Sequence, residues 1–293
     1  MPQKLLRPTA LVLLCAALAL CWVIGKSYEP SVRSGETELP LTEAEAAELH
    51  FPLLALTRAD QDTEGEGALD LDLSACTGEC LITEGGTFRL RGSLNGTLRI
   101  AAEEQTVHLL LDNVTVTSPS GPALLAESAG KLILTLPENT VSTFSDSGRY
   151  AGSDDEACVS CRADLTINGK GALVVNGFYK DAVRSAGVVR IPEGEITIKC
   201  KRTGIHGADG IFVGGGKLNI SSEKHGLRTT KSGAEGRGSL VVAGGDHRII
   251  AGRYAFLTAR GDLYVYRCRI YDTSIVSTYS VGGQARIQSG CFK

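Results

Sequence analysis

Basic residues recur at a regular interval in the C-terminal half of the sequence. Lys180, Arg202 and Lys224 are each 22 residues apart, and Arg253 continues the series after an insertion. Ammonium and guanidinium groups bind carboxylates directly through charge-assisted hydrogen bonds. If the basic residues share one face, they form a stripe that would bind an acidic polymer without a bridging metal; alternatively, they are solubilising charges on turns. The candidate ligand-binding residues are Lys180, Arg184, Lys201, Arg202, His206, Lys224, Arg228 and Arg253.

Charge is divided unevenly along the 293 residues, although the formal net charge is only −3. Residues 27–180 carry 10 Lys/Arg and 24 Asp/Glu, a net of −14, whereas residues 181–293 carry 17 and 9, a net of +8. A basic half attached to an acidic half is either a mixed solvated surface or a field that attracts a partner. Nucleic acid is not expected, because no aromatic stacking positions alternate with the basic residues.

The elements that position these side chains are predicted by a repeat. Val183, Ile205 and Leu227 follow one another at 22 residues, and Ile191 and Val213 keep the same interval. The repeat is rich in glycine and β-branched residues and lacks a helical period, which indicates a solenoid of strands. Three short strands with their turns fill 22 residues, so we expect an all-β parallel β-helix. An antiparallel sandwich would not repeat at a fixed interval.

Short apolar runs separated by Gly, Asn and Asp extend this pattern from residue 66 to residue 293. Glycines at the turns, such as Gly216 and Gly245, are expected to take positive φ. Insertions at residues 145–157 and 233–239 are expected to leave one side of the solenoid as loops. No stretch between 66 and 293 supports a helix of three turns.

The N-terminus predicts export. Lys4 and Arg7 precede an uncharged run from Pro8 to Gly25, so residues 1–25 are a secretory signal or a membrane anchor, and we favour the anchor. Residues 26–65 read as a linker followed by a cap, with a short helix opened by a capping box at Thr42 and Glu45. This helix is expected to cover the N-terminal end of the solenoid.

The strand phrases resemble a known family. FRLRGSLNGTLRIAA, DLTINGKGALVVNG and the DAVRS and GIHGADGI rungs are similar to the carbohydrate-binding, calcium-binding right-handed β-helix domains of bacterial cell-surface proteins, which have a pectate-lyase-like fold. The resemblance covers roughly residues 66–293. It implies a right-handed winding, an extracellular or cell-surface location, and non-catalytic binding of polysaccharide, particularly of acidic, pectin-like polymers.

The resemblance also implies calcium held by acidic residues at turns. Calcium takes six to eight oxygen ligands, for which clustered carboxylates and turn carbonyls are suited. The alternative is that single aspartates hydrogen-bond the turn backbone. The residues that match the acidic positions of the family are Asp154, Asp155, Glu156, Asp164, Asp181, Asp209 and Asp262.

The sequence departs from the family where its rungs begin with Asp-Gly-Ile. Thr203, His225 and Tyr254 stand in those positions, and basic residues surround them. This departure puts calcium in the C-terminal half in doubt.

Two other functions stay open: a polysaccharide lyase of the same fold, with Arg184, Arg202 or Arg228 as the base, and a structural surface adhesin. A glycoside hydrolase is disfavoured because acids are sparse in the basic half. The sequence sets no oligomeric state.

Nine cysteines do not form a metal motif. Cys158 and Cys161 lie where a strand is expected, which would direct their side chains to opposite faces. Cys161 and Cys200 are in phase with inward residues, so buried thiols are expected there. Cys76 and Cys80 flank a glycine-containing turn, where a disulfide is expected.

Overall fold

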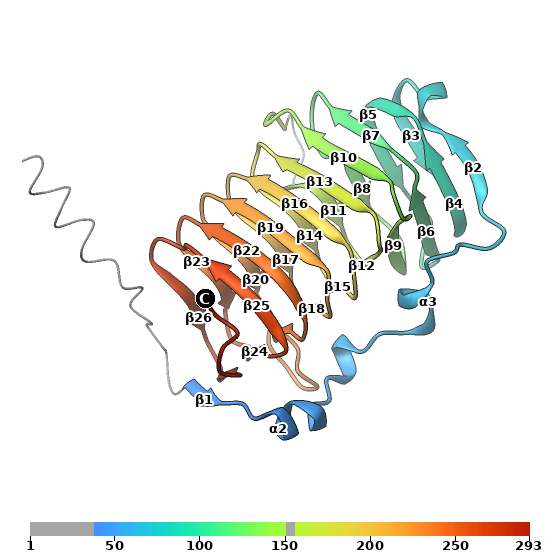
Figure 1. Cartoon of the computed structure of the whole chain (residues 1–293). Coiled ribbons are helices and arrows are strands. Elements are labelled where there is room, and N and C mark those ends of the chain that lie inside the picture. The colour runs from blue at the N-terminus through green and yellow to red at the C-terminus, as the bar shows by residue number, and fades with distance from the viewer. Residues whose placement is uncertain (1–37, 151–155) are drawn as a thin grey trace, which may run out of the picture.

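The chain folds into a solenoid of short parallel strands stacked along one axis (Figure 1). This computed structural model describes residues 38–150 and 156–293. The predicted membrane segment at residues 1–25, together with Asp154 and Asp155, lies outside these residues. Within them, no helix has the length and apolarity needed to cross a membrane.

Each coil contributes one strand to each of three sides, which we call sides A, B and C. Side A is an 11-stranded sheet, and sides B and C are the two limbs of a 16-stranded sheet that share β5. Neighbouring strands pair in parallel throughout, as the repeat predicts.

The strands of side A, in order along the axis, are β2 (Leu69–Asp72), β4 (Gly86–Arg91), β6 (Thr106–Leu111), β9 (Lys131–Leu136), β12 (Asp164–Gly169), β15 (Val188–Ile191), β18 (Gly210–Val213), β21 (Leu240–Val242), β24 (Leu263–Val265), β27 (Ala285–Ile287) and β1 (Glu38–Pro40). Side B contains β3 (Gly78–Ile82), β5 (Ser93–Ile100), β8 (Leu124–Ala126), β11 (Ala157–Cys161), β14 (Asp181–Ser185), β17 (Thr203–Gly207), β20 (His225–Thr229), β23 (Tyr254–Thr258) and β26 (Ser277–Val281). Side C contains the first part of β5 with β7 (Thr115–Ser118), β10 (Val141–Asp146), β13 (Ala172–Gly177), β16 (Glu195–Cys200), β19 (Lys217–Ser222), β22 (Gly245–Ala251) and β25 (Cys268–Asp272). A short 3-10 helix, η2 (Leu73–Ala75), follows β2.

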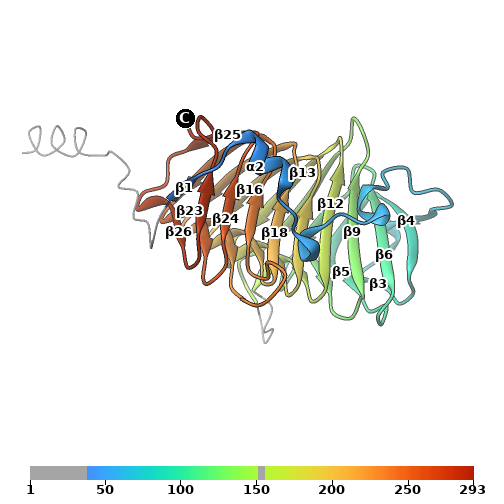
Figure 2. The ribbon, with the colours of Figure 1, turned by 90° about the horizontal axis from the view of Figure 1, so that it is seen from below.

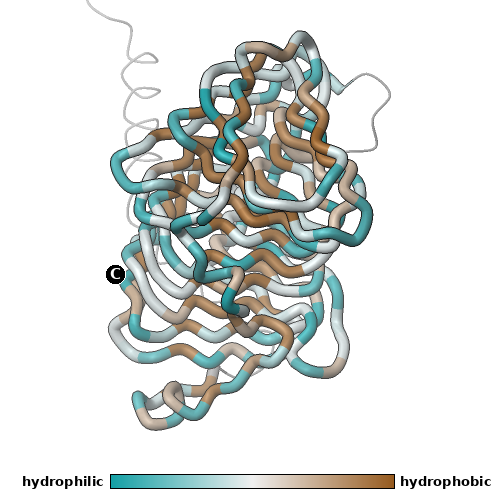
Figure 3. Tube along the Cα trace, turned by 90° about the vertical axis from the view of Figure 1, so that its right-hand side faces the viewer, coloured by the Kyte–Doolittle hydropathy of each residue, from teal (hydrophilic) through white to brown (hydrophobic). Residues whose placement is uncertain are grey.

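The core is a set of apolar columns inside the coils. Val183 pairs with Ile205 and Ile205 with Leu227, so the predicted 22-residue interval is the register of side B. All three side chains are fully buried. Figure 3 shows hydrophobic segments at matching places on successive coils. Burying one such side chain contributes roughly 1.5–3 kcal/mol, so the columns dominate the stability of the fold.

The N-terminal segment, residues 38–67, runs along the outside of side A (Figure 2), and we call it the strap. It begins as β1, which pairs in parallel with β27 at the C-terminal end of the solenoid. It then passes through α2 (Glu43–Glu48), η1 (Pro52–Leu54) and α3 (Arg58–Gln61) to reach β2 at the opposite end. The predicted capping box is confirmed, since the Thr42 side chain accepts from Glu45 N at 3.3 Å and Glu45 accepts from Thr42 N at 2.9 Å.

The predicted position of this cap is wrong. The short helix lies at the C-terminal end, where Glu43 accepts from Arg267 at 2.6 Å and from Gln288 at 2.7 Å. The reason is that β1 supplies the missing neighbour of β27, which would otherwise be an unpaired edge. The C-terminal edge of side A is therefore covered by the chain's own N-terminal segment.

Apolar and polar contacts hold the strap on side A. Leu54 is 1 % exposed and packs in a cluster with Val188 and Val241, which point outward from side A. Asp60 is fully buried and pairs with Lys131 at 2.6 Å. Burial alone would raise the pKa of Asp60, but hydrogen bonds from Lys131, Thr166 and Thr57 outweigh it and hold this pKa below its usual value.

The two insertions leave different corners, contrary to the expectation of one loop-bearing side. The first insertion comes between the end of β10 on side C, at Asp146, and the start of β11 on side B, at Ala157, whereas residues 233–239 come between β20 on side B and β21 on side A. The expectation of positive φ at turn glycines is confirmed, with φ of +73° at Gly216 and +96° at Gly245.

The cysteines of the described residues are free thiols. Burial of Cys161 and Cys200 is confirmed, and desolvation raises the pKa of each to about 12. Cys158 was expected on the opposite face from Cys161, but it is also fully buried and belongs to the same core cluster. The expected disulfide between Cys76 and Cys80 is not formed, and burial raises the pKa of the Cys80 thiol to about 12.

Candidate functional site

The solenoid brings the predicted basic residues together on the outside of side B. Arg184 pairs with His206 and His206 with Arg228 in the registers of β14, β17 and β20, so these three side chains form one outward row. We call the eight predicted ligand-binding residues the basic face: Lys180, Arg184, Lys201, Arg202, His206, Lys224, Arg228 and Arg253.

A second row follows the corner between sides C and B. Arg202 N donates to Lys180 O at 2.8 Å, Lys224 N to Arg202 O at 3.1 Å, and Arg253 N to Lys224 O at 2.7 Å. These residues are therefore stacked in successive coils, at a strand spacing of ~4.8 Å. Lys201 lies at the same corner and is exposed.

A carboxylate occupies one end of the basic face. Glu156 Oε1 lies 2.8 Å from Lys180 Nζ, and its Oε2 lies 2.5 Å from Arg184 Nη1 and 2.6 Å from Arg202 Nη2. The Arg202 hydrogen bond is the main cause of a pKa of Glu156 that is far below its usual value. We call Glu156 with these three cations the paired half of the basic face.

The buried carboxylate of Asp181 holds Arg202, one of the three cations of the paired half, in position. It is fully buried and accepts from Arg202 Nε at 2.7 Å and from Arg202 Nη2 at 2.8 Å, a two-point contact that fixes the guanidinium plane. Its Oδ1 also accepts from Thr203 N at 3.0 Å, and its Oδ2 lies 3.6 Å from His206 Nδ1. Burial would raise the pKa of Asp181, but the hydrogen bonds from Arg202, together with the nearby His206 imidazole, outweigh burial and lower this pKa.

The other end of the basic face carries cations without carboxylates. Over the described ranges, Lys224, Arg228 and Arg253 form no ion pair. Arg228 Nε is buried without a hydrogen-bond partner, and desolvation lowers the pKa of this guanidinium. We call these three residues, with His225, Thr203 and Tyr254, the open half.

His225 is the centre of the open half. It is 6 % exposed, and burial followed by the charges of Arg228, Arg253 and Lys224 lowers its pKa to about 4, so the imidazole is neutral at pH 7. Its ring stacks on Tyr254 with centroids 5.6 Å apart and planes 5° apart. The Arg253 guanidinium lies over the same Tyr254 ring at 5.6 Å.

Two further buried polar atoms in the open half lack a partner: Thr203 Oγ1 and His225 Nδ1. Buried polar groups are normally hydrogen-bonded, and leaving one unpaired costs roughly 1–3 kcal/mol. Thr203 is fully buried, so the groups that a ligand can reach are the three cations and the half-buried Tyr254 ring, which can together bind an anionic group on a ring-shaped ligand.

The described acids do not form the expected calcium site. Among residues 38–150 and 156–293, no group of three or more His, Cys, Asp or Glu side chains is arranged to hold a metal. Glu156 and Asp181 are neutralised by arginines, and Asp209 pairs with Lys231 at 3.0 Å. Cations at these oxygens would repel Ca²⁺, so these residues do not fit the ion.

The aspartates instead join neighbouring coils. Asp164 Oδ1 accepts from Val188 N at 2.9 Å, and Asp262 Oδ1 accepts from Gln284 N at 2.8 Å. Asp164 also pairs with Arg190 at 2.8 Å. Thr203 N likewise donates to Asp181, so these aspartates accept from the backbone of the next coil, in agreement with the alternative that single aspartates hydrogen-bond the backbone.

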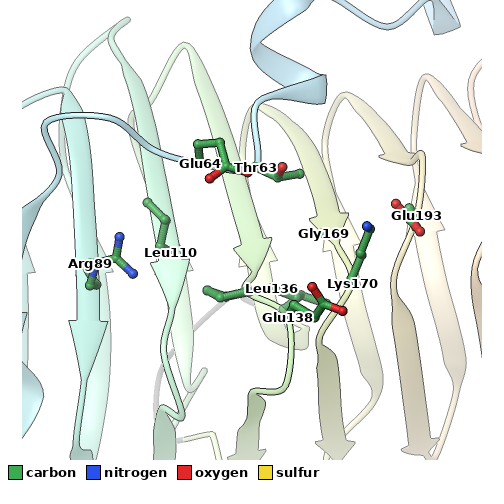
Figure 4. Close-up of a pocket in the computed structure, with 10 residues that line it drawn as sticks. Thr63, Glu64, Arg89, Leu110, Leu136, Glu138, Gly169, Lys170 and Glu193 are labelled. Carbon is green, nitrogen blue, oxygen red and sulfur yellow. The ribbon is translucent and has the colours of Figure 1, made fainter.

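A separate groove of about 330 Å³ lies between the strap and side A (Figure 4). Leu110 and Leu136 line it beside Arg89, Lys170 and three glutamates: Glu64, Glu138 and Glu193. The mixture of exposed charges of both signs gives it no preference for an anion. It lies on a different side of the solenoid from the basic face.

The solenoid thus stacks basic side chains in two rows, on side B and at its corner with side C, whereas the strap runs along side A. The chain belongs to the carbohydrate-binding domain-containing protein family, whose model matches residues 77–285.

The chain is also similar to two other proteins. A carbohydrate-binding domain-containing protein of Acetivibrio thermocellus is 29 % identical over 135 residues, covering 43 % of this chain and 47 % of that relative, so the match spans about half of the relative's length. A solved structure described as a polysaccharide lyase-like protein from C. thermocellum, in a gadolinium derivative, has 23 % identity and a TM-score of 0.72. It covers 76 % of this chain and 97 % of its own, and it shows that the fold is shared.

Sequence reasoning found the basic residues but missed the roles of Thr203, His225, Tyr254 and Glu156. The first three were noted only as departures from an acidic pattern. Their interval was a usable signal, because Asp181, Thr203 and His225 are 22 residues apart and so must stack. Glu156 was assigned to calcium, and only the coil geometry shows that it meets three cations.

Proposed function

We propose that the chain binds an acidic polysaccharide through the basic face without chemically changing it. Family membership supports carbohydrate as the ligand. The observation that carries the proposal is the open half, where Lys224, Arg228 and Arg253 surround a neutral, buried His225. A sugar carboxylate would pair with the guanidinium of Arg228, and the face of the sugar ring would lie against Tyr254.

The direct test is retention of polymer by the purified chain. Immobilised polygalacturonate should retain the chain at low salt and release it as salt rises, because exposed charges are screened within about 10 Å at 0.1 M. An uncharged polysaccharide should retain it weakly. Equal retention on both polymers, independent of salt, would contradict binding through the basic face.

A polysaccharide lyase of the same fold is the second candidate. Arg228 favours it, because this buried guanidinium has a lowered pKa and no carboxylate partner among the described residues. Incubation with polygalacturonate separates the two functions: unsaturated chain ends absorb in the ultraviolet, and their appearance would establish the lyase. A surface adhesin would give neither retention nor new ends.

The proposal also includes the finer predictions that the resemblance implies. They are a right-handed winding, an exported cell-surface location with the N-terminal segment as anchor, and calcium. A calcium site would need Asp154 and Asp155, since the described acids do not fit the ion. An ion that binds only the folded state must raise the melting temperature, so an unchanged melting temperature with calcium would remove it from the proposal.

A further inference from the structure

We infer that Lys180, Arg184 and Arg202 form a second carboxylate subsite, which Glu156 fills as an internal substitute for the ligand. This rests on the proposed function and extends it. The open half would bind an acidic polysaccharide of any length, whereas the second subsite would engage only when a longer chain displaces Glu156. Glu156 would then be the residue that limits how many sugars the face binds.

The contacts of Glu156 show that this subsite accepts a carboxylate. One oxygen binds the Lys180 ammonium at 2.8 Å and the other binds two guanidinium groups, at 2.5 Å to Arg184 and 2.6 Å to Arg202. These are the lengths of charge-assisted hydrogen bonds. A uronate carboxylate has the same two oxygens and the same charge, so it can make the same contacts.

The subsite is held in shape by groups other than Glu156. The buried carboxylate of Asp181 contacts Arg202 at two points, which fixes the guanidinium from the side facing the core. Lys180 Nζ lies 4.8 Å from the centroid of the Tyr179 ring, which in turn stacks on Tyr150 at 4.2 Å. Removing Glu156 should therefore leave two of the three cations close to their present positions.

The second subsite is continuous with the open half. Arg202 is followed one coil later by Lys224, and Arg184 is followed two coils later by Arg228, along the two rows of the basic face. The rows advance by one strand spacing, ~4.8 Å, per coil. A linear polymer of acidic sugars lying along the solenoid axis can therefore offer carboxylates to both halves. A branched or alternating polymer, with fewer charges per length, would reach fewer subsites.

The net charge of the paired half determines how Glu156 affects the binding of this extended ligand. Three cations face Glu156 and Asp181 in the paired half, a net of +1, so a ligand carboxylate must replace Glu156 rather than join it. Glu156→Gln leaves a neutral amide of the same shape and raises the net charge of the subsite to +2. The variant should bind long acidic oligomers more tightly and leave short ones unaffected.

The experiment is calorimetric titration of the purified chain with oligogalacturonates of one to six sugars. We expect the affinity of the unmodified chain to level off at about three sugars, and that of Glu156→Gln to rise further, to about tenfold above it for the longest oligomers, or about 1.4 kcal/mol. Glu127→Gln is the matched control. It also removes a carboxylate from one cation of side B outside the basic face, Arg99, which pairs with Glu127 at 2.7 Å and keeps a second partner, Glu79, at 3.5 Å.

The outcomes are separable. A gain by Glu156→Gln that Glu127→Gln lacks, and that Arg184→Ala in the same chain reverses, supports the subsite. Identical length profiles for Glu156→Gln and the unmodified chain overturn it while leaving the proposed function intact. If no acidic oligomer binds either protein, the proposed function itself fails. Melting curves of each variant identify a loss of folding, in which case Glu156→Ala replaces Glu156→Gln in the same titration.

Discussion

Sides A and B both carry outward polar residues, but the hydrogen-bond partners of these residues differ between the two sides. On side A, the strap supplies partners: Arg190 donates to Leu53 O at 2.7 Å and to Ala55 O at 3.1 Å, and Asp60 binds Lys131. On side B, nothing in the described chain covers the open half, and Thr203 Oγ1, His225 Nδ1 and Arg228 Nε have no partner. The same sheet architecture thus supports a closed wall on one side and a binding face on the other.

The largest expected effect is on the closed side. Asp60→Ala would leave Lys131 without its buried partner, and breaking a buried pair by removing one member costs about 3–5 kcal/mol. Chemical denaturation of the purified chain measures this loss. Glu127→Ala is the control, because its partly exposed pair with Arg99 should cost at most about 1 kcal/mol. Equal losses in the two variants would mean that the strap does not stabilise side A.

Lowering the pH should reduce the free energy of unfolding, and His225 on side B should contribute more to this loss than His108 on side A. Folding lowers the pKa of His225 to about 4 and also lowers that of His108 on side A, in each case chiefly by desolvation. Between pH 6.5 and 4 the unfolded chain binds protons that the folded chain does not, so stability falls as pH falls. His225 alone should contribute about 2 kcal/mol of this loss between pH 7 and pH 5.

The comparison of His225→Gln with His108→Gln tests this difference between the sides. Denaturation at pH 7 and at pH 5 should show that His225→Gln removes more of the pH dependence, because three cations add to the burial of His225. His108 instead has Asp62 nearby, which opposes the shift. A larger effect from His108→Gln would contradict the electrostatic description of the open half.

Arg228→Ala should separate binding from stability. The guanidinium is partly desolvated and its Nε has no partner, so its removal should leave the free energy of unfolding unchanged or slightly higher. Retention on acidic polymer should fall by roughly tenfold, about 1.4 kcal/mol. Arg190→Ala on side A is the opposite case, with reduced stability and unchanged retention. Loss of stability in Arg228→Ala would assign this residue a structural role.

The smallest expected effect is at Tyr254. Tyr254→Ala removes the ring that stacks on His225 and supports Arg253, contacts that are worth about 0.5–1 kcal/mol. Affinity for acidic oligomers should fall by about threefold. Tyr271→Ala on side C is the control, since this tyrosine is 42 % exposed and outside the basic face. Equal effects at the two tyrosines would remove Tyr254 from the binding face.

Much of the fold could be predicted because a solenoid repeats in sequence what it repeats in space. The interval from Val183 to Ile205 and Leu227 is the register of side B, and it also aligns Lys180 with Arg202 and Lys224. The location of the short helix was predicted wrongly. No local pattern in residues 38–67 predicts that β1 pairs with β27, because this pairing joins residues more than 240 positions apart.

The sequence by itself determined the parallel repeat, the clustering of basic residues and the capping box at Thr42. These depend on local periodicity and on side-chain chemistry within a few residues or one coil. Only the tertiary structure decided which cations are free, because Glu156 reaches Arg184 and Arg202 across the coils that follow it, 28 and 46 residues along the chain. Side A likewise became the closed side because of contacts between distant segments. Which charged side chains pair in a solenoid depends on which rows of residues meet at a corner. Only the stacking of the coils determines that.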